Sequence, residues 1–440
     1  MSRRPALCAS TSRRFALVLL LALIAASCAA REGDDIGTPI FNGTTPDGVV
    51  VEPPRTTLPA PTISAIRVPV DAVSIQQAVD QSQPGDLILV DPGVYSEDVV
   101  VSTPDIVIRG RDRNTVFVDG LHSLSIGITV AADGVAIENL TVRNYLNDAI
   151  RVGSNGAVAV NQFRALHVTT SNTGDNGLFL QNVTNAELRQ GWHSGHGGAG
   201  VRIADCSQCN TLVTTTLAEF SNAGFLVSGA AEGVSVFSST SRNNRVGILV
   251  EDSSTQPTSG AVVAGNLVLN NGFNSTPSND PSSDRSFGVG IQVGGTISTQ
   301  VAANRVSGNT RVGVLLAPNN SGLSGDPIAP MVSRNVAEGH PESDIVVAFA
   351  DQFIDPSTCI TDNGAATIGP PGAAEAAVCG DANVAPPAFE WTSTAHEAID
   401  YVNGPVPPVI DGLVDADASV PVPAGPVTLP AAASAVVPAG

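Results

Sequence analysis

The 440-residue sequence contains no lysine, because all 21 of its basic residues are arginines. A catalytic lysine is therefore excluded. Acidic residues number 41, and the formal net charge is -20. Binding to nucleic acid depends on basic side chains that release counterions from the phosphates, so this charge balance excludes a broad nucleic-acid surface.

Charged residues, aromatic residues and long apolar runs are also scarce. Only 14% of the residues are charged and 4% are aromatic, whereas 42% are hydrophobic. This composition excludes a coiled coil and a charge-rich disordered chain. The longest apolar run, residues 15–26, is too short to cross a bilayer of about 30 Å as a helix.

The N-terminal segment has the pattern of a bacterial export signal, with arginines before the apolar run. Residues 25–28 read Ala-Ala-Ser-Cys and resemble a lipobox, so Cys28 is the expected lipid anchor, with simple signal cleavage as the alternative. Residues 12–17 resemble a twin-arginine signal, although an ordinary basic region has the same composition. We expect residues 1–27 to be a signal peptide and residues 28–65 to be a tether. The mature protein would then lie outside the cytoplasm, either anchored to the membrane through Cys28 or secreted.

Four further cysteines follow the signal. Cys206 and Cys209 form a C-x-x-C motif, and Cys359 and Cys379 lie near the C-terminal end. An even number of cysteines outside the cytoplasm favours two disulfides, in which Cys379 could reach back to Cys359. A zinc site at the C-x-x-C motif is the alternative.

Short apolar segments recur along most of the chain. Their aligned apolar residues are Ile150, Leu178, Val201, Phe225, Ile248, Ile291, Val314 and Ile345. The basal step is 23 residues, and longer steps indicate loops inserted at fixed corners. Apolar residues alternate with period two inside each unit, which indicates strands. Strands that stack on themselves at every repeat predict a parallel β-helix with inward apolar columns.

Asparagines occur in pairs five residues apart before several of these strands. The pairs are Asn139 and Asn144, Asn266 and Asn271, and Asn304 and Asn309. Asparagine tolerates left-handed turn geometry, and its amide can bond the same amide in the next coil. We therefore expect asparagine ladders at the corners of the solenoid.

The repeat 301–316 resembles that of the right-handed parallel β-helix superfamily, which includes pectate lyases and polygalacturonases. Ser74 and Gln77 form a capping box before the apolar residues Ile75, Ala78 and Val79, as in the N-terminal capping helix of that superfamily. The resemblance implies an all-β solenoid over residues 66–363. Residues 364–403 would then form a C-terminal cap, and residues 404–440, rich in Pro and Ala, a flexible tail.

The same resemblance implies a substrate groove along one column of strands. Arg151, Phe179 and Arg202 would then stand outward on successive coils, with the two arginines roughly 10 Å apart. We expect Phe179 to stack on a sugar face while Arg151 and Arg202 bind carboxylate or hydroxyl oxygens. The alternative is an exposed row in which the arginines neutralise nearby aspartates.

Candidate catalytic groups come from the turns that precede these strands. His196, in a pair with His193, would act as acid or base at neutral pH. Asp175 or Asp205 would orient it, and Arg202 completes the candidate set. The alternative places His196 in a ladder, where it satisfies a turn. Gly195-His196-Gly197 resembles a polygalacturonase motif, but the paired aspartates of those hydrolases are missing. No cofactor is expected; a calcium-assisted lyase with an arginine base is the alternative.

The leading hypothesis is an exported, lipid-anchored β-helix protein that binds a cell-wall or extracellular polysaccharide. Lyase, epimerase or hydrolase activity would extend that role. A neutral glycan suits the net charge, whereas an acidic glycan needs a local basic strip or calcium. A noncatalytic structural or adhesive protein is the second hypothesis, and resemblance to maturation factors of nitrous oxide reductase is a third. We expect a monomer that binds no nucleic acid.

Overall fold

The computed structural model describes residues 65–156, 158–252, 257–273, 286–318, 325–349, 357–377 and 379, all within one compact unit that begins at Thr62. The predicted signal peptide, lipid anchor Cys28 and C-terminal tail lie outside the described residues, as does nearly all of the predicted tether. No helix of the described ranges is both long enough and apolar enough to cross a membrane.

Three parallel sheets, here named I, II and III, make up nearly all of the described chain. Sheet I contains β1 (Ala65–Val68), β2 (Leu87–Val90), β5 (Val107–Gly110), β8 (Ala136–Glu138), β12 (Arg164–Leu166), β16 (Glu187–Arg189), β19 (Thr211–Thr214), β22 (Val234–Phe237), β25 (Val262–Ala264), β28 (Gln300–Ala302), β31 (Met331–Ser333) and β34 (Cys359–Thr361). Sheet II contains β4 (Val99–Val101), β7 (Ile128–Val130), β10 (Ile150–Val152), β14 (Leu178–Gln181), β18 (Ala199–Ala204), β21 (Ala223–Ser228), β24 (Val246–Glu251), β27 (Val289–Gly294), β30 (Val312–Ala317), β33 (Ser343–Val347) and β36 (Ile368–Gly369). Sheet III contains β3 (Gly93–Tyr95), β6 (Val116–Asp119), β9 (Thr141–Arg143), β13 (Thr169–Thr173), β17 (Trp192–His196), β20 (Leu217–Glu219), β23 (Thr240–Arg242), β26 (Leu267–Leu269), β29 (Arg305–Ser307), β32 (Val336–Glu338) and β35 (Gly364–Ala365).

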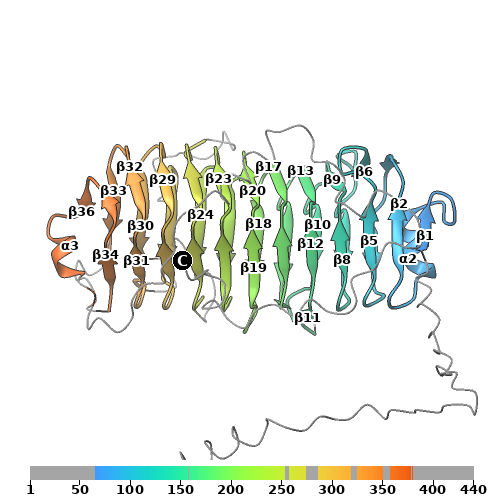
Figure 1. Ribbon diagram of the computed structural model, residues 1–440, viewed down its shortest axis with the longest axis horizontal. Helices are drawn as coiled ribbons and strands as arrows, with labels where there is room; N and C mark the ends of the chain where they lie inside the picture. Colours follow the sequence, from blue (N-terminus) through green and yellow to red (C-terminus); the bar gives the residue numbers. More distant parts are fainter. Residues whose placement is uncertain are drawn as a thin grey trace, which may run out of the picture. The chain divides into compact units, whose positions relative to one another are not determined.

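The chain visits these sheets in the repeating order I, III, II, so each circuit adds one strand to every sheet. Figure 1 shows the resulting stack of strands running along the molecule. A small extra sheet pairs β11 (Val160–Asn161) with β15 (Val183–Thr184). The described part of the chain is therefore a right-handed parallel β-helix of about 11 turns.

The strand register of sheet II confirms the predicted repeat. Ile150 pairs with Leu178, Leu178 with Val201, and the same column continues to Ile345. It also extends through Ile128 to Val99 at one end and to Ile368 at the other, beyond the predicted members. The paired side chains of this column between Ile128 and Ile345 are almost fully buried. Branched and aromatic residues suit this pleated, enclosed position, so the sequence period and the core coincide.

Asparagine ladders run through two corners of the C-terminal half. In the first, the side-chain amide of Asn266 donates to Asn304 at 3.0 Å, and Asn304 donates to Asn335 at 2.9 Å. In the second, Asn271 donates to Asn309 at 2.9 Å, and His340 contacts the amide of Asn309. These bonds satisfy polar groups that the solenoid encloses.

Asn139 and Asn144 lie outside these two ladders, although Asn144 accepts a hydrogen bond at 3.5 Å from the amide of Asn172 on the next coil. Both adopt left-handed backbone conformations, with φ of 54° and 61°. The amide of Asn139 donates to the carbonyl of Gly110, and that of Asn144 donates to Asp119. Spacing along the chain could not separate the two kinds of asparagine, because ladder and left-handed positions lie side by side at each corner.

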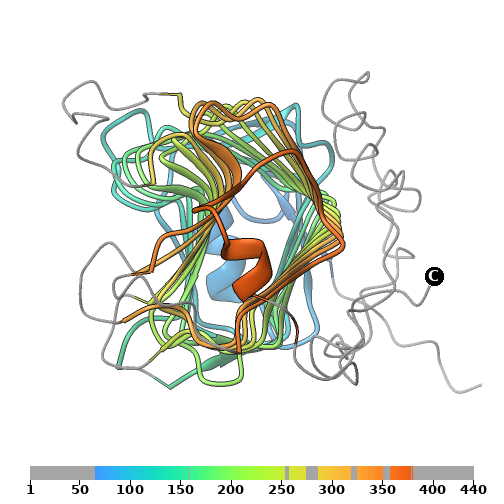
Figure 2. The ribbon, with the colours of Figure 1, turned by 90° about the vertical axis from the view of Figure 1, so that its left-hand side faces the viewer.

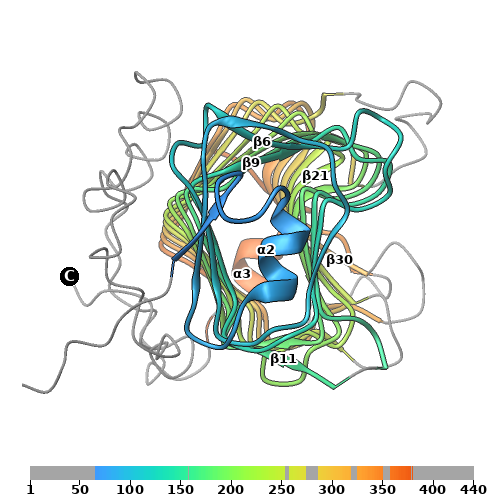
Figure 3. The same cartoon turned by 90° about the vertical axis from the view of Figure 1, so that its right-hand side faces the viewer.

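A short helix closes each end of the described solenoid (Figures 2 and 3). Helix α2 (Ile75–Gln81) begins at Ser74, whose hydroxyl accepts a hydrogen bond from the backbone N–H of Gln77. Its apolar face, made of Ile75, Ala78 and Val79, is buried as predicted. Glu97 accepts hydrogen bonds from two backbone N–H groups of the first turn, which completes the cap.

At the other end, β35 and β36 continue the solenoid to Gly369, a few residues past the predicted boundary at residue 363. Helix α3 (Ala373–Ala376) follows, with Ala373 and Ala377 buried against the last coil. A disulfide joins Cys379 to Cys359 in β34. Residues 380–403 of the predicted cap lie outside the described residues.

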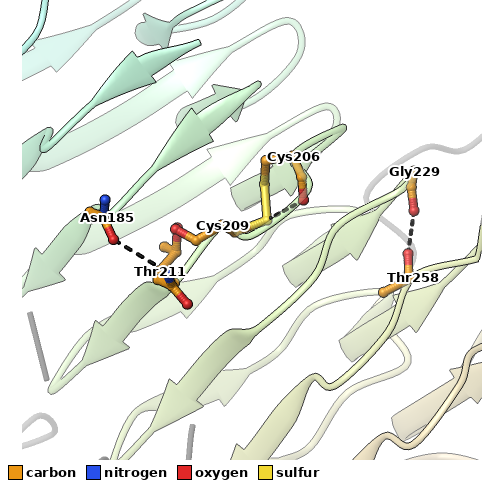
Figure 4. The surroundings of a disulfide bond; sticks show 7 residues. Asn185, Cys206, Cys209, Thr211, Gly229 and Thr258 are labelled. Atoms are coloured by element: carbon orange, nitrogen blue, oxygen red, sulfur yellow. Dashed lines mark hydrogen bonds between the residues drawn. A yellow bond between two sulfur atoms is a disulfide. The ribbon is translucent and has the colours of Figure 1, made fainter. Parts of the chain in front are cut away.

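The C-x-x-C motif lies at the corner between β18 and β19 (Figure 4). Cys206 and Cys209 are joined by a disulfide, and both side chains are buried in the core. Because the disulfide engages both thiols, this pair offers no thiolate ligands for zinc.

Candidate functional site

The outer face of sheet II brings together the residues predicted to bind a ligand. Arg151, Phe179 and Arg202 occupy paired positions on β10, β14 and β18. The guanidinium carbon of Arg151 lies 5.4 Å from the centre of the Phe179 ring, and that of Arg202 lies 4.7 Å from it. These are cation–π distances.

Phe179 is only 6% exposed, because the two guanidinium groups flank its ring. A sugar could stack on this ring only if an arginine moved away. The sequence pattern predicted that Phe179 points outward, but it did not predict that the two guanidinium groups cover its ring. The geometry therefore indicates that Phe179 is a positioning residue, whose ring orients both arginine side chains on the surface.

The two arginines differ in their partners. Arg151 pairs with the buried carboxylate of Asp148 at 2.5 Å, and Asp148 also accepts a hydrogen bond from Asn176. Among the described residues, Arg202 makes no ion pair, and its buried Nε has no hydrogen-bond partner. Arg202 is thus the arginine whose charge is left for a ligand, whereas that of Arg151 is largely neutralised.

Asp175 lies near Arg202, in the turn that leads into β14. Burial raises the pKa of its carboxyl above the ordinary value, and the negative charge of Asp148 raises it further, against the opposing effects of Arg202 and Arg151. A half-buried carboxyl of raised pKa beside an unpaired cation suits proton transfer.

Asp175 and Arg202 line a hollow of about 400 Å³ on this face, here named the sheet II hollow. Its other charged lining residues are Arg245 and Glu251, and Leu226 and Leu249 supply an apolar floor. Alternation along β21 and β24 points these leucines outward. The hollow combines apolar surface with a few convergent polar groups, as ligand sites do.

His196 lies inside the solenoid rather than in the hollow. It is 1% exposed, and its two ring nitrogens lie 2.7 Å and 3.0 Å from the hydroxyls of Thr173 and Thr170. His193 is also buried and contacts the same hydroxyl of Thr170. Burial lowers the pKa of both histidines to about 3, so both rings are neutral near pH 7. This placement matches the alternative in which His196 satisfies a turn of the coil.

The acidic residues near sheet II do not form a calcium site. Asp148 is occupied by Arg151 and Asn176, and Asp205 accepts a hydrogen bond from Gln181. Within the described ranges, no group of three or more His, Cys, Asp or Glu side chains is arranged to hold a metal ion. Calcium takes six to eight oxygen ligands, so these residues do not fit it.

The sequence patterns did not predict an aromatic pair beside the hollow. Phe220 and Phe273 lie at its edge as an exposed aromatic pair. The available signal was a bulky residue where neighbouring coils have Asn or Gly at the same turn, which becomes visible only when the turns as well as the strands are aligned.

The three sheets define the described chain as a parallel β-helix. No protein-family model and no curated protein sequence matches it. Among solved structures, it is similar to pectate lyase Pel9A at 14% identity and a TM-score of 0.38, covering 68% of this chain and 73% of that one. It is also similar to an alginate lyase from Paenibacillus sp. str. FPU-7, at 15% identity and a TM-score of 0.40, covering 70% and 95% of the two chains. A third is the catalytic domain of a GH87 alpha-1,3-glucanase in complex with nigerose, at 12% identity and a TM-score of 0.46, covering 74% and 68%.

Proposed function

We propose that the protein binds a polysaccharide along the outer face of sheet II, with the sheet II hollow as the centre of the site. The observation that carries this proposal is the unpaired, partly buried guanidinium of Arg202 beside Asp175. A cation that makes no direct ion pair within the described residues favours an anionic partner. An acidic glycan supplies such groups at every uronate unit.

The same pair supports lyase or epimerase chemistry as the finer proposal. Both reactions begin with removal of the proton next to a uronate carboxylate, which needs a base and a cation that stabilises the developing negative charge. Asp175, whose pKa is raised, would accept the proton, and Arg202 would bind the carboxylate. The chain has no lysine for either role.

The protein would bind its glycan outside the cytoplasm, in keeping with the predicted signal peptide. A lipidated Cys28 would hold the solenoid at the membrane while the sheet II hollow meets the glycan. Mass spectrometry of the protein expressed in a bacterium with lipoprotein processing tests this part separately, since lipidation adds diacylglyceryl mass to a chain that begins at Cys28.

The binding test uses the full chain with polygalacturonate and alginate as acidic probes and dextran as a neutral probe. We expect Arg202→Gln to weaken binding of the acidic probe by roughly 10- to 100-fold, because charge-assisted hydrogen bonds are lost. Affinity electrophoresis and titration calorimetry measure this change. The matched control is Arg189→Gln, an exposed arginine on sheet I that pairs with Glu187.

Equal affinity of the wild type and Arg202→Gln would contradict the proposal, and so would absence of binding to all three probes. The same incubations are followed by ultraviolet absorbance for unsaturated products and by NMR for epimerised units. Product formation extends the proposal to catalysis. Binding without product leaves a protein that recognises the glycan without acting on it.

A further inference from the structure

Phe220 and Phe273 form an exposed aromatic pair beside the sheet II hollow. Their side chains are 40% and 48% exposed, and no other aromatic residue of the described ranges is among the exposed large hydrophobic residues. The ring centres lie 5.7 Å apart at an interplanar angle of 81°, an edge-to-face arrangement. The pair therefore presents aromatic surface to solvent rather than to the core.

Phe220 occupies an unusual backbone position for a bulky residue. It directly follows β20, in the turn that leads into β21, and its φ is 53°. The strand register aligns this turn position across the coils of sheet III. The aligned residues, all with positive φ, are Asn144, Asn172, Gly195, Phe220, Asn243, Asn270, Gly308 and Gly339.

Every other member of this column is Asn or Gly, the residues that adopt left-handed geometry most readily. A phenylalanine is strained there, and its exposure means that core burial does not offset the strain. Backbone strain of this kind collects at functional sites. The combination of strain and exposure indicates that the ring of Phe220 serves a partner outside the fold.

The pair adjoins the hollow directly. Asn222, in the same turn as Phe220, and Ala223, the first residue of β21, line the hollow. The backbone N–H of Phe273 donates to the carbonyl of Asn244, next to Arg245, which also lines it. Aromatic surface thus borders a polar hollow at one corner of the solenoid.

A sugar ring has the matching surfaces, because its C–H face is apolar and its hydroxyl edge is polar. We infer that Phe220 and Phe273 form an aromatic subsite that holds one sugar unit of the glycan against the edge of the sheet II hollow. The inference rests on the proposed function and deepens it. In this inference the aromatic pair recognises the apolar face of a pyranose ring, next to the charged residues of the hollow.

The test is Phe220→Asn in the full chain, which installs the residue of neighbouring coils. We expect binding of the best probe among polygalacturonate, alginate and dextran to weaken about tenfold. The unfolding temperature should rise, because the strain is relieved. Phe273→Ser should weaken binding in the same direction, since it removes the second ring.

The matched control is Leu121→Asn. Leu121 is 60% exposed with a φ of 52°, but it lies on the coil of β6, four strands from β20 along sheet III. This control should also raise the unfolding temperature while affinity stays unchanged. Unchanged affinity in Phe220→Asn, with binding still lost in Arg202→Gln, overturns the aromatic subsite and leaves the proposed function standing. A lowered unfolding temperature in Phe220→Asn would assign the ring to structure and overturn the subsite too. Absence of binding in the wild type overturns both.

Discussion

At the scale of single residues, the solenoid gives similar side chains opposite environments. Asp148 and Asp175 both lie in turns beside sheet II, yet Asp148 is bonded to Arg151 and Asn176 while Asp175 lines the hollow. Which residues become chemically available is set by the coil above and below each one. His196 illustrates the same point, because the hydroxyls of Thr170 and Thr173 enclose its ring.

The buried histidines predict a pH dependence of stability. The folded-state pKa of His193 and of His196 is about 3, below the ordinary value of 6.5. The unfolded chain therefore binds protons at these histidines that the folded chain does not bind. The free energy of unfolding accordingly falls as the pH drops from about 6.5 toward 3. Each ring contributes up to about 1.4 kcal/mol per pH unit in that window.

Chemical unfolding measured from pH 7 to pH 4 checks this expectation. His196→Asn is the informative variant, because Asn244 and Asn271 occupy the same column two and three coils further on. The variant should lose about one proton of pH dependence below pH 6.5. An unchanged slope would show that His196 is charged or exposed in the folded protein.

At the scale of elements, the ladders turn the corners of the coils into continuous hydrogen-bonded columns. Asn304 accepts from both the backbone N–H and the amide of Asn266, and its own amide donates to Val263 and Asn335. Each amide therefore links three consecutive coils. Such a buried network is stable only when every member is satisfied.

Asn304→Ala should accordingly destabilise the protein by roughly 2–4 kcal/mol, since it leaves buried donors and acceptors on both neighbouring coils unsatisfied. The free energy of unfolding from urea titration measures the loss. Asn147→Ala is the control: this asparagine is exposed, and its amide donates only to Ser125, so we expect a change within about 0.5 kcal/mol. Equal effects of the two substitutions would refute a cooperative ladder.

At the scale of the whole molecule, the sequence predicted the fold better than the site. The column from Ile150 to Ile345 and the capping box of Ser74 follow from local patterns, because alternation and helix caps are written in neighbouring residues. The cover over Phe179 and the enclosure of His196 depend on residues one coil away. Contacts between residues 23 or more positions apart leave no short-range pattern in the sequence. The arrangement of the candidate site could therefore be described only from the structure.

The linear stacking of coils predicts that local unfolding at one end of the solenoid stays confined to the coils near that end. Each coil contacts only its neighbours, so stability is approximately a sum over adjacent coils. The Cys359–Cys379 disulfide, with a sequence separation of 20 residues, ties α3 to the last strand of sheet I. A crosslink over a loop of this size stabilises by about 3 kcal/mol.

Replacing both cysteines by serine should therefore fray β34–β36 and α3 while the coils from β10 to β24, which carry the sheet II hollow, remain protected. Hydrogen exchange followed by mass spectrometry resolves these segments, and polysaccharide affinity should stay at the wild-type value because the site lies several coils away. Uniform loss of protection along the whole solenoid would mean that the coils unfold as a single cooperative unit, and it would contradict this prediction.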